Sequence, residues 1–126
     1  MKYKTLSVVG LTIAMSFSAS SAFAEKTLNA EEAKALFTGK TFDGFNEIKG
    51  KSYQVYSDAN GTMIHKNQKR TKEFTWSIDS EGRHCAHLKN MRCGKIISMG
   101  DGVYHKMRDG EHINTLKNFR DGNQLD

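Results

Sequence analysis

The sequence predicts a small all-β protein, a lipocalin-like antiparallel β-barrel with a short helix before its first strand. Two patterns indicate this fold class. Turn-forming residues recur along the chain, as at Asn60-Gly61, Gly100-Asp101-Gly102 and Asp109-Gly110, and such pairs adopt the positive φ angles that tight hairpins require. Between the turns, apolar and polar residues alternate with a period of two, which is typical of strands with one buried face.

The residues before the first strand predict a helix. Asn29 suits the N-cap position, and Glu32, three residues later, completes a capping-box pattern. The alanines that follow, together with Leu36, favour a short helix, and Gly39 suits its C-terminal cap.

Strand prediction depends on which residues share a face. Phe74, Trp76 and Ile78 alternate with polar residues and would lie on one side of a strand. Seven or eight segments are candidate strands, over residues 41–46, 51–57, 61–66, 73–79, 83–88, 92–98, 103–108 and 112–119. A consecutive meander of this length hides its edges most easily by closing into a barrel. The modest hydrophobic content indicates a narrow, filled interior.

The first residues of the chain predict export. Lys2 and Lys4 precede the apolar run Leu6–Phe17, which is too short to span a bilayer core of about 30 Å. Ala22-Phe23-Ala24 then offers the small side chains that signal peptidase requires. We therefore predict a cleaved signal peptide over residues 1–24, a single domain over residues 25–126, and a periplasmic or secreted protein. The mature chain is expected to hold no transmembrane segment.

Two cysteines remain after this cleavage, Cys85 and Cys93. An even number of cysteines in an exported chain predicts a disulfide. A hairpin that turns at Lys89-Asn90 would place the two residues directly opposite each other, within bridging distance. A redox or metal site is the weaker alternative, because such sites use closer cysteine spacing.

The basic residues are unevenly distributed. Without Lys2 and Lys4 the mature chain keeps 17 basic and 14 acidic residues, a net charge of +3. One dense cluster lies between two predicted strands and consists of Lys66, Lys69, Arg70 and Lys72. We favour a solvated turn, and the alternative is a contact with an anionic polymer or lipid head group. No nucleic-acid-binding motif accompanies the cluster, so no nucleic-acid partner is expected.

The histidines suggest one candidate metal site. A two-residue turn at Asp109-Gly110 would set Met107 opposite His112, with His105 diagonally on the same face. A set of His105, Met107 and His112 would suit copper, whose reduced form favours thioether ligands. We favour the alternative that these are ordinary half-exposed strand residues, and we expect no cofactor. His84 and His87 would point to opposite faces of their strand.

No catalytic pattern stands out, since no nucleophile elbow or phosphate-binding loop surrounds the nucleophilic residues. We therefore expect a binding protein rather than an enzyme. Possible ligand-lining residues are Tyr53, Trp76 and Tyr104, because aromatic side chains with a polar end can face a cavity. Of these, Trp76 is expected mainly to fill the core.

Several short motifs carry a resemblance to known proteins: Leu28, Leu36-Phe37-x-Gly39-x-Thr41, Tyr56-x-Asp58-x-Asn60-Gly61-Thr62, Trp76-Ser77-Ile78-Asp79, Gly82-x-x-Cys85 and Cys93-Gly94. Their order resembles a group of short secreted bacterial proteins catalogued as a domain of unknown function. The resemblance covers most of the mature chain. It implies a lipocalin-like barrel in the periplasm and supplies no catalytic residues.

A more distant similarity is to small secreted barrel inhibitors of bacterial metalloproteases, which also begin with a short helix and carry one disulfide. The chain has no match to their inhibitory N-terminal segment. The leading hypothesis is a periplasmic or secreted barrel that binds a small ligand or a partner protein through its open end and adjoining loops. A copper-type metal carrier and a protease inhibitor are the alternatives.

Overall fold

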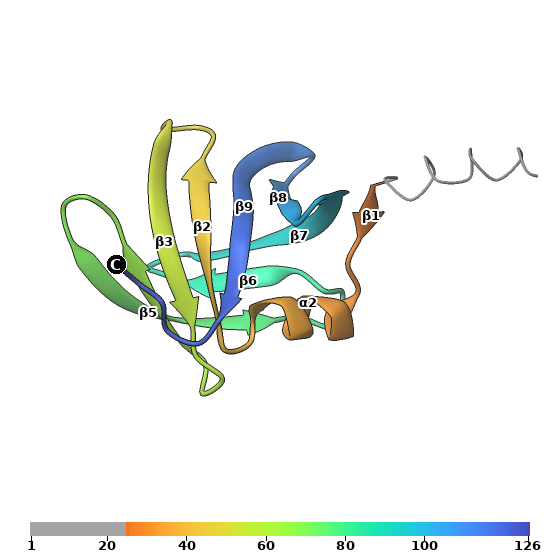
Figure 1. The fold of residues 1–126 in the computed structure, drawn as a ribbon. Coiled ribbons are helices and arrows are strands. Elements are labelled where there is room, and N and C mark those ends of the chain that lie inside the picture. The colour runs from red at the N-terminus through yellow and green to blue at the C-terminus, as the bar shows by residue number, and fades with distance from the viewer. Residues whose placement is uncertain (1–24) are drawn as a thin grey trace, which may run out of the picture.

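The computed structural model describes residues 25–126, and the predicted signal peptide lies outside the described residues. In chain order the described elements (Figure 1) are β1 (Lys26–Thr27), α2 (Ala30–Phe37), β2 (Lys40–Asn46), β3 (Lys51–Ser57), β4 (Thr62–Lys66), β5 (Thr71–Ile78), β6 (His84–His87), β7 (Met91–Gly100), β8 (Val103–Arg108) and β9 (Glu111–Asp121). The predicted strands are all present, with ends that differ by one to two residues from the prediction in most cases.

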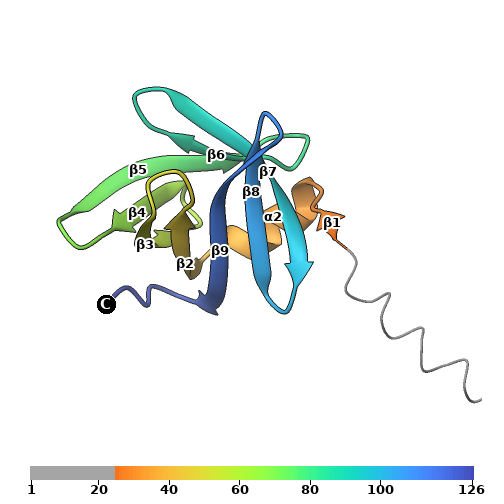
Figure 2. The same ribbon diagram turned by 90° about the horizontal axis from the view of Figure 1, so that it is seen from above.

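Strands β2 to β9 form a closed, eight-stranded antiparallel barrel, which confirms the predicted fold class. Each strand pairs with the next along the chain, and β9 returns to pair with β2. Figures 1 and 2 show these strands curving around a common interior. The two-residue strand β1, which was not predicted, pairs with the end of β7 outside this ring.

Helix α2 covers one end of the barrel (Figure 1). The predicted capping box is present, because Asn29 Oδ1 accepts from Glu32 N–H at 2.8 Å and Glu32 Oε1 accepts from Asn29 N–H at 2.9 Å. The helix buries Ala33 and Phe37 completely. The Phe37 ring packs against aromatic rings from four strands, at centroid distances of 4.4 to 6.4 Å: Phe42, Trp76, His84 and Phe119.

The end of the barrel beside α2 is therefore filled with side chains. Trp76 is only 8% exposed, and its indole N–H donates to the backbone oxygen of Asp58 at 3.0 Å. This places Trp76 in the core, as expected. A filled interior was predicted for the whole barrel. The prediction is correct for the end beside α2 and wrong for the other end, which contains a cavity.

The disulfide prediction is confirmed. Cys85 on β6 lies directly opposite Cys93 on β7 in the antiparallel register, and the two side chains form a disulfide across a sequence separation of 8. No free cysteine remains among the described residues. The bridge ties β6 to β7 next to the hairpin that joins them.

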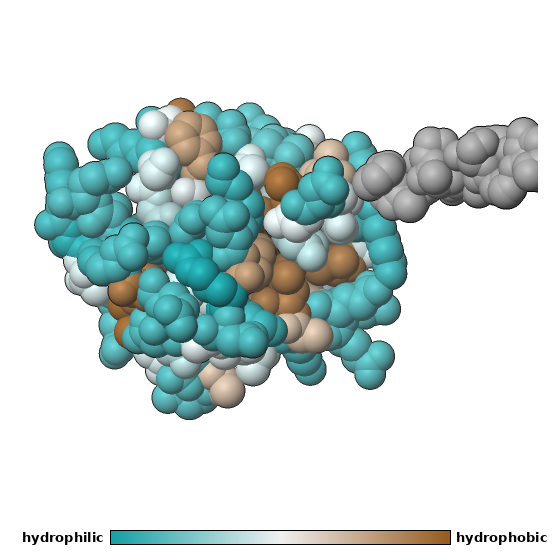
Figure 3. Space-filling view, viewed as in Figure 1, coloured by the Kyte–Doolittle hydropathy of each residue, from teal (hydrophilic) through white to brown (hydrophobic). Residues whose placement is uncertain are grey.

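The face of the molecule in Figure 3 is mainly hydrophilic, and this includes the loop that joins β4 to β5. Apolar side chains show in the middle of this face, near β9 and the start of α2 (Figure 3). In the described part of the chain, no helix has the length and apolar character needed to cross a membrane.

Candidate ligand-binding site

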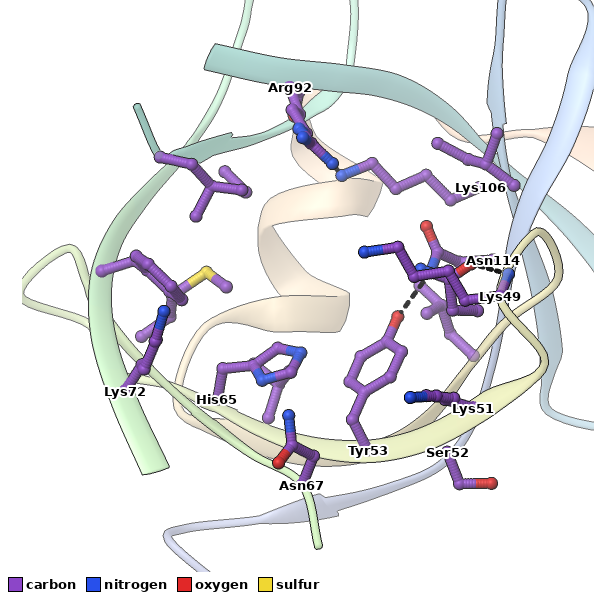
Figure 4. Close-up of a pocket in the computed structure, with 18 of the residues that line it drawn as sticks. Lys49, Lys51, Ser52, Tyr53, His65, Asn67, Lys72, Arg92, Lys106 and Asn114 are labelled. Atoms are coloured by element: carbon purple, nitrogen blue, oxygen red, sulfur yellow. Dashed lines mark hydrogen bonds between the residues drawn. The ribbon is translucent and has the colours of Figure 1, made fainter. Parts of the chain in front are cut away.

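A cavity of about 750 Å³ lies inside the barrel, at the end away from α2. Figure 4 looks into it, with α2 behind. Its mouth is formed by the loops that join β2 to β3, β4 to β5 and β6 to β7, because antiparallel hairpins alternate between the two ends of a meander. A volume of this size falls within the range of about 300–1,000 Å³ that is typical of small-molecule sites.

The inner wall of the cavity is largely apolar. The side chains that supply this surface come from six different strands and from the loop after β6, and they include Phe42, Val55, Met63, Phe74, Ala86, Leu88, Ile113 and Leu116. Their alternation with outward-facing residues follows the period-two geometry of strands. This surface can accept the apolar part of a ligand.

The charged residues of the cavity all have the same sign. Eight basic residues line it and no aspartate or glutamate does: Lys49, Lys51, Lys69, Arg70, Lys72, Arg92, Lys106 and Arg108. None of the eight takes part in the ion pairs found among the described residues. A concave surface of one charge inside low-dielectric walls concentrates ions of the opposite charge. The cavity therefore favours anions.

Lys106 on β8 differs from the other seven because it is buried, with 7% of its surface exposed. Its Nζ lies 3.0 Å from His84 Nδ1 and 3.5 Å from the backbone oxygen of Arg92. Burial is the main cause that lowers the pKa of the Lys106 ammonium from 10.5 to about 8, and the nearby Arg108 and Arg92 guanidinium groups contribute to the same shift. At neutral pH this amine is still mainly protonated, and no carboxylate neutralises it.

A glycine makes room for this lysine. A Cβ at Gly94 on β7 would stand 3.0 Å from Lys106 Cγ and closer still to the Met107 backbone oxygen. Glycine within a strand often marks such a close approach. The absence of a side chain at Gly94 thus lets the Lys106 side chain lie along the barrel wall.

His84 is the immediate neighbour of Lys106. Its ring packs against those of Phe37 and Trp76, at centroid distances of 4.4 and 6.0 Å. Burial holds the pKa of His84 well below its ordinary value, and the charge of Lys106 acts in the same direction. His84 is therefore neutral and accepts a hydrogen bond from the Lys106 ammonium at Nδ1, so Nε2 carries the ring hydrogen. That buried nitrogen has no hydrogen-bond partner among the described residues.

Tyr53 and His65 lie side by side on the opposite wall (Figure 4). Their rings stack at a centroid distance of 4.7 Å, and the Tyr53 hydroxyl accepts from Asn114 Nδ2 at 2.8 Å. Burial raises the pKa of Tyr53 and lowers that of His65, so both rings are neutral at pH 7. A Cβ at Gly44 would overlap the Tyr53 ring, so this arrangement requires glycine there.

The other residues singled out from the sequence are divided between the cavity and its surroundings. Tyr53 lines the cavity, whereas Trp76 and Tyr104 do not. In the basic cluster, Lys69, Arg70 and Lys72 lie at the mouth, while Lys66 lines a shallower outer hollow. The cluster is therefore part of the rim of an internal cavity.

The candidate copper residues are neighbours on the outside of the barrel. Met107 pairs with His112 as expected, and the His105 and His112 rings stack at 3.6 Å with an angle of 13°. The lone pair of an imidazole nitrogen lies in the plane of its ring, and two rings stacked face to face in nearly parallel planes do not point their lone pairs at one ion as they stand. His112 Nε2 also lies 2.9 Å from Thr115 Oγ1. Among the described residues, no group of three or more His, Cys, Asp or Glu side chains is placed to hold a metal. The copper site stays a prediction.

Sequence reasoning missed the most unusual residue of the cavity, Lys106. The alternation of Tyr104, Lys106 and Arg108 along β8 was visible, but charged side chains normally face solvent. The sequence did contain two signals of the cavity wall, the glycines Gly44 and Gly94 inside predicted strands. Glycine within a strand often marks a close approach of another group, which here is the Tyr53 ring at Gly44 and the Lys106 side chain at Gly94.

Comparisons of the chain with protein-family models, with curated proteins and with solved structures gave no match. The resemblance to the secreted bacterial group and the similarity to barrel protease inhibitors stay predictions.

Proposed function

We propose that this protein is an exported binding protein that holds an amphipathic organic anion inside its barrel. The observation that carries the proposal is the composition of the cavity wall, in which eight basic residues and no acidic residue accompany an apolar inner surface. A ligand with an apolar body and one acidic group fits both parts of this wall. A cationic ligand would meet only like charges.

The two parts of the wall would act in different ways. Transfer of apolar groups from water into the cavity supplies affinity, at about 0.8 kcal/mol for each CH₂ group buried. The exposed lysines and arginines at the mouth raise the local concentration of anions and the association rate, with little selectivity for a particular ligand. Because these mouth charges face solvent, salt screens them over a Debye length of about 10 Å.

Export remains a prediction from residues 1–24. The disulfide between Cys85 and Cys93 supports it, since such bonds persist in oxidising compartments such as the periplasm or the extracellular space.

The test is a comparison of three ligands with the same alkyl chain. Purified protein is loaded with the fluorescent anion anilinonaphthalene sulfonate, which is then displaced with decanoate, decanol or decylamine. We expect decanoate to bind more tightly than decanol, and decanol more tightly than decylamine. Equal affinity for all three, or the tightest binding with decylamine, would contradict the proposal.

A variant in which Lys66, Lys69, Arg70 and Lys72 are all replaced by glutamine tests the contribution of the mouth. Decanoate should bind this variant more slowly and with less dependence on salt, whereas decanol binding should be unchanged. An unchanged salt dependence would show that the cluster only solvates its loop.

A further inference from the structure

We infer that Lys106 is an internal anchor for the acid group of the ligand, so that the ligand enters the barrel with its acidic end first. This inference rests on the proposed function and adds the position and orientation of the bound anion. Seven of the eight basic residues lie at or near the mouth, and only Lys106 is buried.

The depth of Lys106 follows from its neighbour. Its amine contacts His84, and the His84 ring packs against Phe37 of α2, the helix that covers the far end of the barrel. In Figure 4 the Lys106 side chain extends across the upper wall toward Arg92, with α2 behind. A ligand atom that touches the Lys106 amine therefore lies inside the barrel beside His84, below the exposed side chains of the mouth.

Residues 25–126 supply no negative partner for this amine. Its two hydrogen-bond acceptors, His84 Nδ1 and the Arg92 backbone oxygen, are neutral. The titratable groups around it are His84 of β6, Arg92 of β7 and Arg108 of β8, and those on the rest of the cavity wall are Lys51 and Tyr53 of β3, His65 of β4, Lys72 of β5 and, in the loops, Lys49, Lys69 and Arg70. None is acidic. A buried ammonium ion without a counter-ion is costly, so an anion that binds beside it removes an unfavourable state.

A second unsatisfied group lies in the same region of the wall. His84 Nε2 is buried without a partner, and it carries a hydrogen because Nδ1 accepts from Lys106. The two incompletely paired groups in this part of the cavity wall, Lys106 Nζ and His84 Nε2, are thus hydrogen-bond donors. Donors without acceptors in a cavity select a ligand group that accepts only, and an ionised carboxylate is such a group.

The chemical class that follows is a monocarboxylate, or a compact anion of similar size, with an unbranched or slender apolar tail. The tail would lie along the apolar wall between Lys106 and the mouth. Esters and alcohols of the same length lack the negative charge that Lys106 requires.

The experiment compares decanoate and decanol binding to the wild-type protein, to Lys106→Met and to Lys69→Met, by isothermal titration calorimetry. Methionine is close to lysine in length, and Lys69→Met is a matched loss of charge at the mouth. We expect Lys106→Met to weaken decanoate binding by about thirtyfold or more, as for a buried charge pair that loses one member. Decanol binding should change little, and Lys69→Met should have only a small, salt-sensitive effect.

The pH dependence supplies a readout that a merely structural role would not alter. The pKa of Lys106 is about 8 in the free protein, so the ammonium ion is present below that pH and is lost above it. Wild-type affinity for decanoate should therefore fall by up to about tenfold for each pH unit above this value. The Lys106→Met variant should show no such fall.

Two outcomes separate the inference from the proposed function. If Lys106→Met binds decanoate as tightly as the wild type while Lys69→Met binds it poorly, the acid group lies at the mouth and the inference is wrong, although the proposed function stands. If the wild-type protein binds neither decanoate nor decanol, both are wrong.

A measurement on the wild type covers the case in which Lys106→Met does not fold. In carboxyl-labelled decanoate bound to the protein, the carboxyl carbon resonance should titrate at a pH well below that of free decanoate, because Lys106 holds the carboxylate in its ionised form. A bound carboxyl group that titrates like the free acid would overturn the inference.

Discussion

Replacing Lys106 by methionine should change how the stability of the protein depends on pH. The buried ammonium ion is unfavourable in the folded protein, which is why the pKa of Lys106 falls from 10.5 to about 8. In the unfolded chain the same group keeps its proton up to its ordinary pKa. Between these two values the unfolded chain binds more protons than the folded one, so the free energy of unfolding of the wild type rises with pH.

The size of this effect follows from the two pKa values. The full penalty in the wild type at neutral pH is about 3 kcal/mol, at about 1.4 kcal/mol for each unit of pKa difference. From about pH 7 to pH 9.5 the free energy of unfolding of the wild type should therefore rise by about 2 kcal/mol relative to that of Lys106→Met. At neutral pH the variant also leaves His84 Nδ1 without its donor, a cost of about 1–3 kcal/mol that offsets part of its gain.

Urea denaturation of both proteins across this pH range measures the difference. Lys95→Met, which removes an exposed lysine of β7, provides a control for the loss of a lysine side chain. A difference between wild type and Lys106→Met that stays constant from about pH 7 to pH 9.5 would show that the Lys106 amine is solvated, and the reasoning about an uncompensated charge would then be wrong.

Three further predictions concern the barrel itself. Replacing both Cys85 and Cys93 by alanine should lower the free energy of unfolding by about 2–3 kcal/mol, the value for closing a short loop, and thermal unfolding with and without reductant checks this; an unchanged melting temperature would contradict it. Gly44→Ala should cost about 1–3 kcal/mol because its Cβ overlaps the Tyr53 ring, and much less in a Tyr53→Ala background; equal costs in both backgrounds would refute the contact. Trp76→Ala should cost about 3–5 kcal/mol in urea denaturation, and a near-neutral result would remove Trp76 from the core.

Local sequence signals predicted most of the fold. Hairpin turns and alternating strands are specified by residues close together in the chain, and so are the capping box at Asn29 and the pairing of Cys85 with Cys93. Each depends on spacing along one hairpin or one helix turn. Closure of the barrel followed from the number of consecutive strands, because a meander of this length leaves two edges unpaired unless it closes.

The site was predicted only in part, because it depends on how α2 occupies one end of the barrel. Phe37 fills that end and packs against Trp76, so Trp76 lies in the core and Tyr53, nearer the other end, lines the cavity. The inward position of Lys106 contradicts the usual preference of lysine for solvent. Its placement depends on contacts between strands far apart in sequence, including the space left at Gly94.

The claim that the barrel interior is the ligand site can be tested directly by methyl-resolved NMR during a titration of the wild-type protein with decanoate. The account predicts shifts in methyl groups that line the cavity, those of Val55, Met63, Ile113 and Leu116. The methyl groups of Ile64 and Ile97, which alternate with inward-facing residues on β4 and β7, should not move. Shifts confined to Ile64, Ile97 and other outward-facing methyl groups, or no shifts at saturating decanoate, would contradict it.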